Sequence, residues 1–161
     1  MNQMSSLAFP DGPLEGELRQ EPRFVQNFRI RRIGQRPLIF EGSELCMAMS
    51  YIPGARFWYE TNIYKTATQR FVVAIRLFFK SEDERDRVRA WEFDSFEQVL
   101  ACLEGYDACE DVRVDRFPDE TGTGAAELAA QAFALESRIA DARAQFAGLV
   151  GEILYELESG S

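Results

Sequence analysis

Four arginines stand close together in the stretch FRIRRIGQRPLIF, and their guanidinium groups are the clearest candidates for chemistry in this sequence. Residues 22–40 contain five arginines and no acidic residue, although the whole chain has a formal net charge of −9. A guanidinium group binds phosphate or carboxylate through a planar fork of N–H donors. The candidate contacts for an anion or a partner protein are therefore Arg29, Arg31, Arg32 and Arg36.

Three interpretations of this basic stretch are open. The one we favour is that it offsets the acidic residues of segment 81–120, within the fold or across an oligomer interface. In the second, the arginines dock a protein partner. In the third, residues 23–36 contact a nucleic-acid backbone while Phe24 and Phe28 stack on bases; the acidic segment could equally act as a nucleic-acid decoy. The acidic groups expected to face the arginines include Glu92, Asp94 and Glu97.

The sequence contains no histidine, and this absence excludes much catalytic chemistry. Ser-His-Asp triads, Cys-His pairs and histidine-ligated zinc sites all need an imidazole group. The three cysteines, Cys46, Cys102 and Cys109, form no CxxC pair, and we expect free thiols in a reducing cytoplasm. We therefore expect a non-enzymatic protein without metal or cofactor.

Three further motifs carry polar groups of interest, but each has a simpler structural explanation. FWYETNIY (57–64) could line a ligand pocket around Glu60 and Tyr64, although aromatic strands more often supply core packing. YDACEDVRVD (106–115) is acidic but lacks the pattern of a calcium loop. The Gly-x-Gly at 122–124 lacks the context of a dinucleotide fingerprint and is interpreted as a linker that caps the next helix.

The elements that position these residues are mainly strands. Residues 1–21 predict an irregular arm, and residues 22–117 predict a sheet domain with one helix at 95–105, which begins with a Ser-x-x-Gln capping box. Ile33 falls on the arginine face unless a β-bulge near Arg31 resets the alternation. The arms 56–66 and 70–80 predict a hairpin. The expected strands are 23–33, 36–40, 44–52, 56–66, 70–80, 87–94 and 111–117.

A linker at 118–124 leads into a long alanine-rich helix, 125–158. Its apolar residues recur with spacings of four and three, which is the heptad pattern of a coiled coil. Such a helix spans about 50 Å and exceeds the ~20–35 Å of the strands. We therefore expect it to mediate self-association through Leu128, Leu135, Ile139, Phe146, Leu149 and Ile153.

These patterns predict an α+β protein, in which a mainly antiparallel, aromatic-rich sheet has a short covering helix and a long C-terminal helix. We expect a cytoplasmic interaction or regulatory protein that forms homo-oligomers and docks a protein partner. Sixteen of its eighteen basic residues are arginine, which fits a GC-rich bacterial genome. Neither a secretory signal nor a membrane span is evident. The alternatives are a nucleic-acid-associated protein and, less favoured, a small enzyme or ligand binder around Glu60 and Tyr64.

Overall fold

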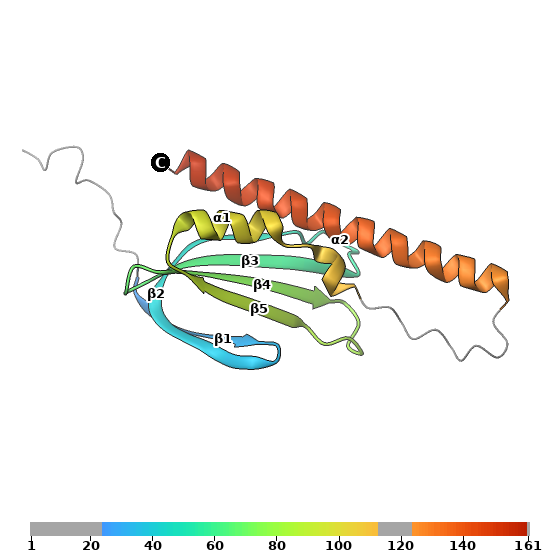
Figure 1. Ribbon diagram of the computed structural model, residues 1–161, viewed down its shortest axis with the longest axis horizontal. Helices are drawn as coiled ribbons and strands as arrows, with labels where there is room; N and C mark the ends of the chain where they lie inside the picture. Colours follow the sequence, from blue (N-terminus) through green and yellow to red (C-terminus); the bar gives the residue numbers. More distant parts are fainter. Residues whose placement is uncertain (1–23, 113–123, 161) are drawn as a thin grey trace, which may run out of the picture.

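The computed structural model describes residues 24–112 and 124–160 (Figure 1). The predicted arm 1–21, most of the predicted strand 111–117 and nearly all of the linker 118–124 lie outside these residues. Within them, the chain forms one antiparallel sheet, a short helix and a long C-terminal helix. The predicted α+β class is thus confirmed.

The sheet is a five-stranded meander, in which each strand pairs with the next one along the chain. Alternating apolar runs separated by tight turns favour this topology, because a short connection can join only antiparallel neighbours. The predicted hairpin is confirmed as the pair formed by β3 and β4, in register from Phe57 opposite Phe79 to Lys65 opposite Phe71. The strands are β1 (Gln26–Arg32), β2 (Gln35–Met49), β3 (Phe57–Thr66), β4 (Phe71–Phe79) and β5 (Arg87–Phe93).

Strand β2 differs from its prediction, because the segments 36–40 and 44–52 were expected to be separate strands. They form one strand of 15 residues, whose first half pairs with β1 and whose second half pairs with β3. Gly42 sits at the overlap, where a Cβ atom would lie 2.2 Å from the carbonyl oxygen of Lys65. A register shift follows between Glu44 and Cys46. Glycine and a bulge therefore bend the strand without ending it.

This bend curls the β1–β2 hairpin under the sheet, so that β1 approaches β5 (Figure 1). The backbone N–H of Ile33 donates to the carbonyl oxygen of Val88 at 3.0 Å. A register shift lies between Ile30, which pairs with Leu38, and Arg32, which pairs with Gln35, so the extra residue is on β2. It does not reset the alternation of β1, and Ile33 is 54% exposed. The curled sheet encloses a small apolar cluster of Ile30, Tyr64, Val72, Ala74 and Ala90, with Phe28, Leu38, Phe40 and Val88 at its border.

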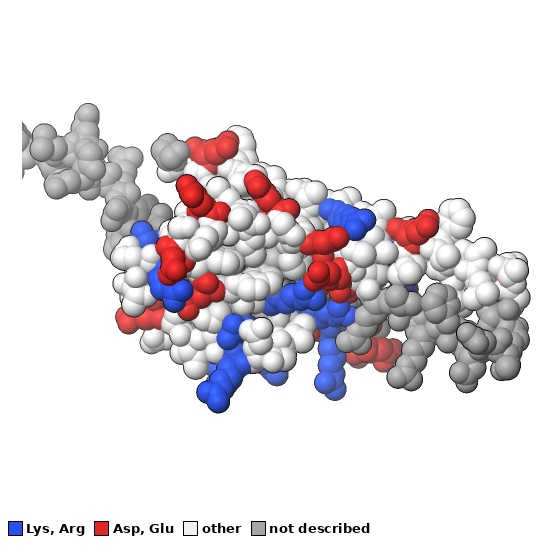
Figure 2. All heavy atoms as spheres, viewed as in Figure 1, with Lys and Arg blue, Asp and Glu red and all other residues white. Residues whose placement is uncertain are grey.

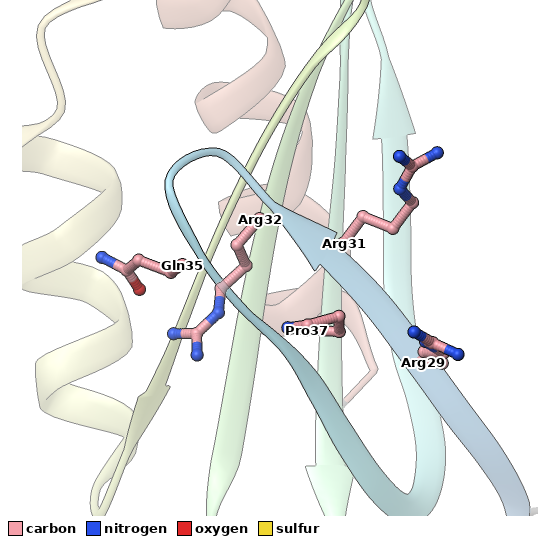
Figure 3. Close-up of a pocket in the computed structure, with 5 residues that line it drawn as sticks. All are labelled: Arg29, Arg31, Arg32, Gln35 and Pro37. Atoms are coloured by element: carbon pink, nitrogen blue, oxygen red, sulfur yellow. The ribbon is translucent and has the colours of Figure 1, made fainter.

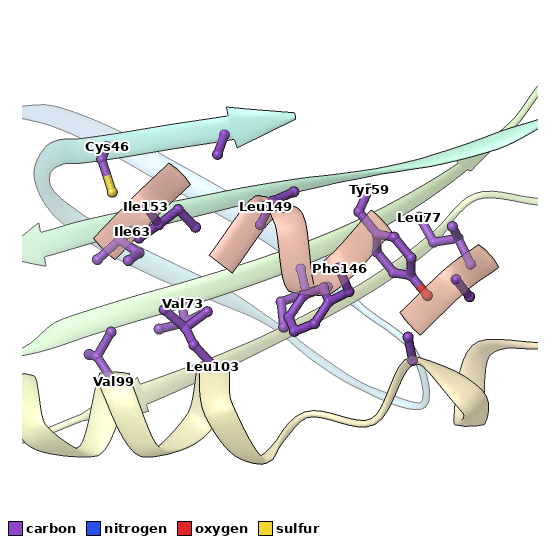
Figure 4. Close-up of a cluster of buried hydrophobic side chains, with 14 residues drawn as sticks. Cys46, Tyr59, Ile63, Val73, Leu77, Val99, Leu103, Phe146, Leu149 and Ile153 are labelled. Carbon is purple, nitrogen blue, oxygen red and sulfur yellow. The ribbon is translucent and has the colours of Figure 1, made fainter. Parts of the chain in front are cut away.

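The opposite face of the sheet carries α1 (Phe96–Gly105), the short 3-10 helix η1 (Ala108–Asp111) and α2 (Ala125–Ser159). The predicted capping box is present, since the Ser95 hydroxyl accepts from the Gln98 backbone N–H and the Gln98 side chain accepts from the Ser95 backbone N–H. Figure 4 shows the main core between sheet and helices, where Phe146, Leu149 and Ile153 of α2 meet strand residues. Burying each such side chain contributes about 1.5–3 kcal/mol.

Strand β4 supplies both apolar clusters. Val73, Ile75 and Leu77 belong to the main core, whereas Val72 and Ala74 face the inner cluster. Its almost continuous apolar run therefore reflects an interior strand covered on both faces. No helix in the described part of the chain is long and apolar enough to cross a membrane.

Candidate interaction surfaces

Three of the four candidate arginines extend from the β1–β2 hairpin in Figure 3, with Arg29 and Arg31 on one side and Arg32 on the other. Arg29, Arg31 and Arg32 line a shallow hollow of about 610 Å³ with Gln35 and Pro37. We call this feature the arginine hollow. Arg36 is not in its lining, but its carbonyl oxygen accepts a hydrogen bond of 2.8 Å from Nε of Arg32. The turn between the strands places Gly34 at a φ of +66°, a conformation that glycine adopts without strain.

The described residues show no pairing of these arginines with the acidic segment within the chain, and the expected alternative, pairing across an oligomer interface, stays a prediction. None of the four makes an ion pair with a carboxylate of residues 24–112 or 124–160, whereas Glu92 and Asp94 both pair with Arg70 at 2.9 Å. The reason is strand order. Arg70 precedes β4, the direct neighbour of β5, whereas the backbone hydrogen bond from the β1–β2 turn reaches β5 at Val88, near the other end of that strand.

Basic and acidic side chains also gather on different parts of the surface. In Figure 2, basic side chains project from the lower rim of the view, where the β1–β2 hairpin lies, and acidic side chains are scattered over α1 and α2. The arginine hollow is thus a basic feature of an acidic protein, with no acidic residue in its lining. Unpaired guanidinium groups of this kind can bind carboxylate or phosphate from outside.

The two phenylalanines predicted to stack on bases are placed differently. Phe28 packs within the inner cluster, with its ring centroid 5.2 Å from that of Phe40 and 4.7 Å from that of Tyr64. Phe24 is 81% exposed. Phe28 is therefore committed to the core, which weakens the nucleic-acid interpretation of the hairpin.

The two halves of the predicted α2 seam differ in burial. Phe146, Leu149 and Ile153 are buried against the sheet of their own chain, as is Ala142. Leu128 is exposed, and Leu135 and Ile139 are half-buried. The C-terminal half of the seam therefore forms the core of one chain, and only the N-terminal half is left for contacts with a second molecule. A single chain does not test self-association itself.

A polar cluster that sequence reasoning missed lies under the middle of α2. Asp111 is almost fully buried, and its Oδ2 accepts hydrogen bonds from the hydroxyl groups of Tyr59 at 2.8 Å and Tyr106 at 2.5 Å. Its Oδ1 lies 3.5 Å from Nη2 of Arg89, and the Arg89 guanidinium lies over the Tyr106 ring. The Phe146 ring contacts both tyrosine rings.

Burial, together with the negative charge of Asp111, raises the pKa of both Tyr59 and Tyr106 well above the ordinary tyrosine value. Each hydroxyl therefore stays protonated and donates a hydrogen bond to the Asp111 carboxylate. The cluster thus ties η1, the sheet and α2 together. The only sequence signal was an aspartate within an otherwise acidic turn, which could not be distinguished from its exposed neighbours.

The cluster borders a cleft of about 720 Å³ between α2, the end of the sheet and the β4–β5 turn. Phe57 and Tyr59 line it, whereas Glu60 and Tyr64 do not. Strand alternation explains the difference, because Glu60 and Tyr64 belong to the opposite face of β3. Glu60 pairs there with Arg76 at 3.3 Å, and burial raises the pKa of Tyr64.

The remaining polar candidates also have structural partners. Asp107 forms two bonds of 3.0 and 2.9 Å with Arg143, and Glu110 pairs with Arg89 at 3.0 Å. Residues 24–112 and 124–160 contain no group of three potential metal ligands. The three cysteines form no disulfide, and burial raises the thiol pKa of Cys46 and of Cys102 to about 11. Both therefore remain protonated and weakly nucleophilic.

Comparison with known proteins identifies no relative. No family model, no curated protein and no solved structure matches the chain. Its function is therefore argued from its own surfaces.

Proposed function

We propose that this protein is a non-enzymatic interaction protein, which self-associates through the first part of α2 and docks a protein partner. The observation that carries the proposal is the length of α2, whose buried residues begin at Ala142. Residues 125–141, called here the helix overhang, have a length of about 25 Å. Much of this length extends past the end of the sheet (Figure 1). Phe133 is 76% exposed and Leu128 is 44% exposed on this overhang.

An overhang of this length needs a partner for its apolar seam. Isolated helices of about 12–15 residues are only marginally stable in water, and most helices gain their stability from packing. The seam formed by Leu128, Ala132, Leu135 and Ile139 continues the heptad spacing of the buried half. A second helix that packs on these residues would extend the core along the whole of α2.

A second copy of this chain fits the overhang in an antiparallel arrangement. If Ala132 packs opposite Leu135 of the second copy, Leu128 falls opposite Ile139. A two-fold axis then repeats each of these facing pairs, as an isologous dimer requires. The same register sets Ala125 of the second copy opposite Ala142, where burial against the sheet begins. Because Ala142 is already buried in the core of its own chain, the pairing would end before that layer, with Leu128 opposite Ile139.

The polar groups support binding more than catalysis. The buried carboxylate of Asp111 already accepts two tyrosine hydroxyls, which occupies the group best placed to act as a base. The thiols of Cys46 and Cys102 have raised pKa values, so neither is an activated nucleophile.

Light scattering on the full chain tests the self-association. We expect a dimer at roughly tens of micromolar, a concentration at which modest helix interfaces associate. Replacing Leu128 and Leu135 together by glutamate should give a folded monomer. The control variant replaces Ala130 and Ser137 by glutamate in the same way. These two residues are exposed and have the same seven-residue spacing, so the control should remain dimeric. A monomeric wild-type protein would refute the proposal, and so would equal dissociation of both variants.

A further inference from the structure

We infer that the arginine hollow binds an extended acidic segment of a protein partner. This inference rests on the partner-docking role proposed above and specifies the chemistry of the partner. Three features of the β1–β2 hairpin carry it: the unbalanced charge, the spacing of the arginines along the strand, and the apolar surface beside them.

The charge of the hollow is unbalanced within the chain. Four arginines elsewhere in the described residues lie close to carboxylates of the same molecule, with nitrogen–oxygen distances of 2.9–3.3 Å. Arg29, Arg31 and Arg32 have no such partner among the described residues, and the other lining residues, Gln35 and Pro37, bring no negative charge. The paired arginines are Arg70, Arg76, Arg89 and Arg143. Neighbouring cations repel one another, so an incoming anion gains from neutralising them.

The spacing of the arginines matches an extended peptide. Arg29 and Arg31 are two residues apart on β1, and alternate residues of a strand are about 6.6 Å apart on one face. An extended segment with acidic residues at alternate positions presents carboxylates at the same interval. The bond from Nε of Arg32 to the carbonyl oxygen of Arg36 holds the third guanidinium in place and leaves its terminal nitrogens available. The hollow is shallow, which suits a chain lying across it.

The apolar surface beside the hollow favours a peptide over a nucleic acid. Ile39 is 70% exposed and stands directly opposite Arg29 in the β1–β2 register, so both side chains lie on the same face of the hairpin. The methylene groups of an acidic side chain that pairs with Arg29 would cover part of Ile39, whereas a phosphate backbone would leave it in water. No aromatic residue lines the hollow to stack on a base.

Fluorescence anisotropy with a labelled peptide in which glutamate alternates with valine tests this inference on the full chain. We expect the peptide to bind at low salt and more weakly as salt rises, because screening weakens exposed charge pairs. Replacing Arg29 and Arg31 together by glutamine should lower the affinity about tenfold. The control replaces Arg56 and Arg85, which lie beside the cleft, and should bind like the wild type. A matched peptide with lysine for glutamate should not bind.

Two further probes decide between sources of negative charge. If an oligothymidylate or vesicles containing phosphatidylserine bind more tightly than the acidic peptide, and the Arg29 and Arg31 double variant loses that binding, the inference is overturned. Absence of peptide binding also overturns it. Circular dichroism and light scattering on the same double variant verify fold and oligomeric state. A dimer that does not bind peptide refutes only this inference, whereas a monomer that binds it refutes only the self-association.

Discussion

Replacing Asp111 with alanine should remove the acceptor at the centre of the cluster that joins η1, the sheet and α2. The Asp111 side chain is 2% exposed. Alanine leaves the hydroxyl groups of Tyr59 and Tyr106 without their acceptor, at about 1–3 kcal/mol each. It also removes one of the two carboxylates near Arg89, which keeps its ion pair with Glu110. Since breaking a buried charged pair costs about 3–5 kcal/mol, we expect the free energy of unfolding to fall by about 4 kcal/mol.

Urea denaturation and thermal unfolding measure this change. For a chain of this size, about 2–4 °C of Tm accompany each kcal/mol, which predicts a fall in Tm of about 8–16 °C. The control is Glu104→Ala, which removes an exposed carboxylate of α1 and should change Tm only slightly. Asp111→Asn keeps an acceptor for the tyrosines and should recover part of the loss.

A double-mutant cycle asks whether the three groups act as a unit. Tyr106→Phe should destabilise the wild-type protein and have much less effect once Asp111 is already alanine, because the shared hydrogen bond is then absent. A loss below about 1 kcal/mol for Asp111→Ala, in the range of an exposed pair, would refute the reasoning. Strict additivity of the two substitutions would refute it as well.

Two other predictions concern pH and backbone packing. The folded-state pKa of Tyr59 and of Tyr106 lies above the unfolded value of about 10, so their contribution to stability is complete below about pH 10 and is lost as pH rises beyond it. In urea titrations, the variant with both tyrosines changed to Phe should therefore lose less stability than the wild type as pH rises. An equal loss in both proteins would contradict the assignment. Gly42→Ala should lower the free energy of unfolding by about 1–3 kcal/mol through overpacking, since its Cβ would collide with the backbone of Lys65. Gly105→Ala, where a Cβ meets nothing within 4 Å, is the control for that measurement.

Local periodicity in the sequence was sufficient to predict most of the regular elements. The aromatic and β-branched arms of β3 and β4 predicted their hairpin, and the Ser95 capping box predicted the start of α1. Local alternation left open whether a bulge would reset β1 near Arg31, and the extra residue of the register shift lies on β2. The break predicted within β2 was wrong, since Gly42 marks a close contact with β3 that the local pattern does not reveal.

The candidate surfaces depended on contacts between residues distant in sequence. A heptad seam indicates that one face of α2 is apolar, but not whether the sheet or another molecule covers it; Phe146 is buried by the sheet, while Leu128 is exposed.

Residue type and spacing were thus enough to predict the α+β class, the antiparallel hairpin and the two helices, because these elements depend on interactions within a few turns. Which charges are paired depends instead on the packing of distant segments. Strand order brought Arg70, rather than the β1 arginines, to Asp94, and the packing of η1 buried Asp111 between two tyrosines. Ion pairs and burial depend on positions in space, and for residues far apart in the chain those positions are fixed by register and layer packing rather than by local sequence.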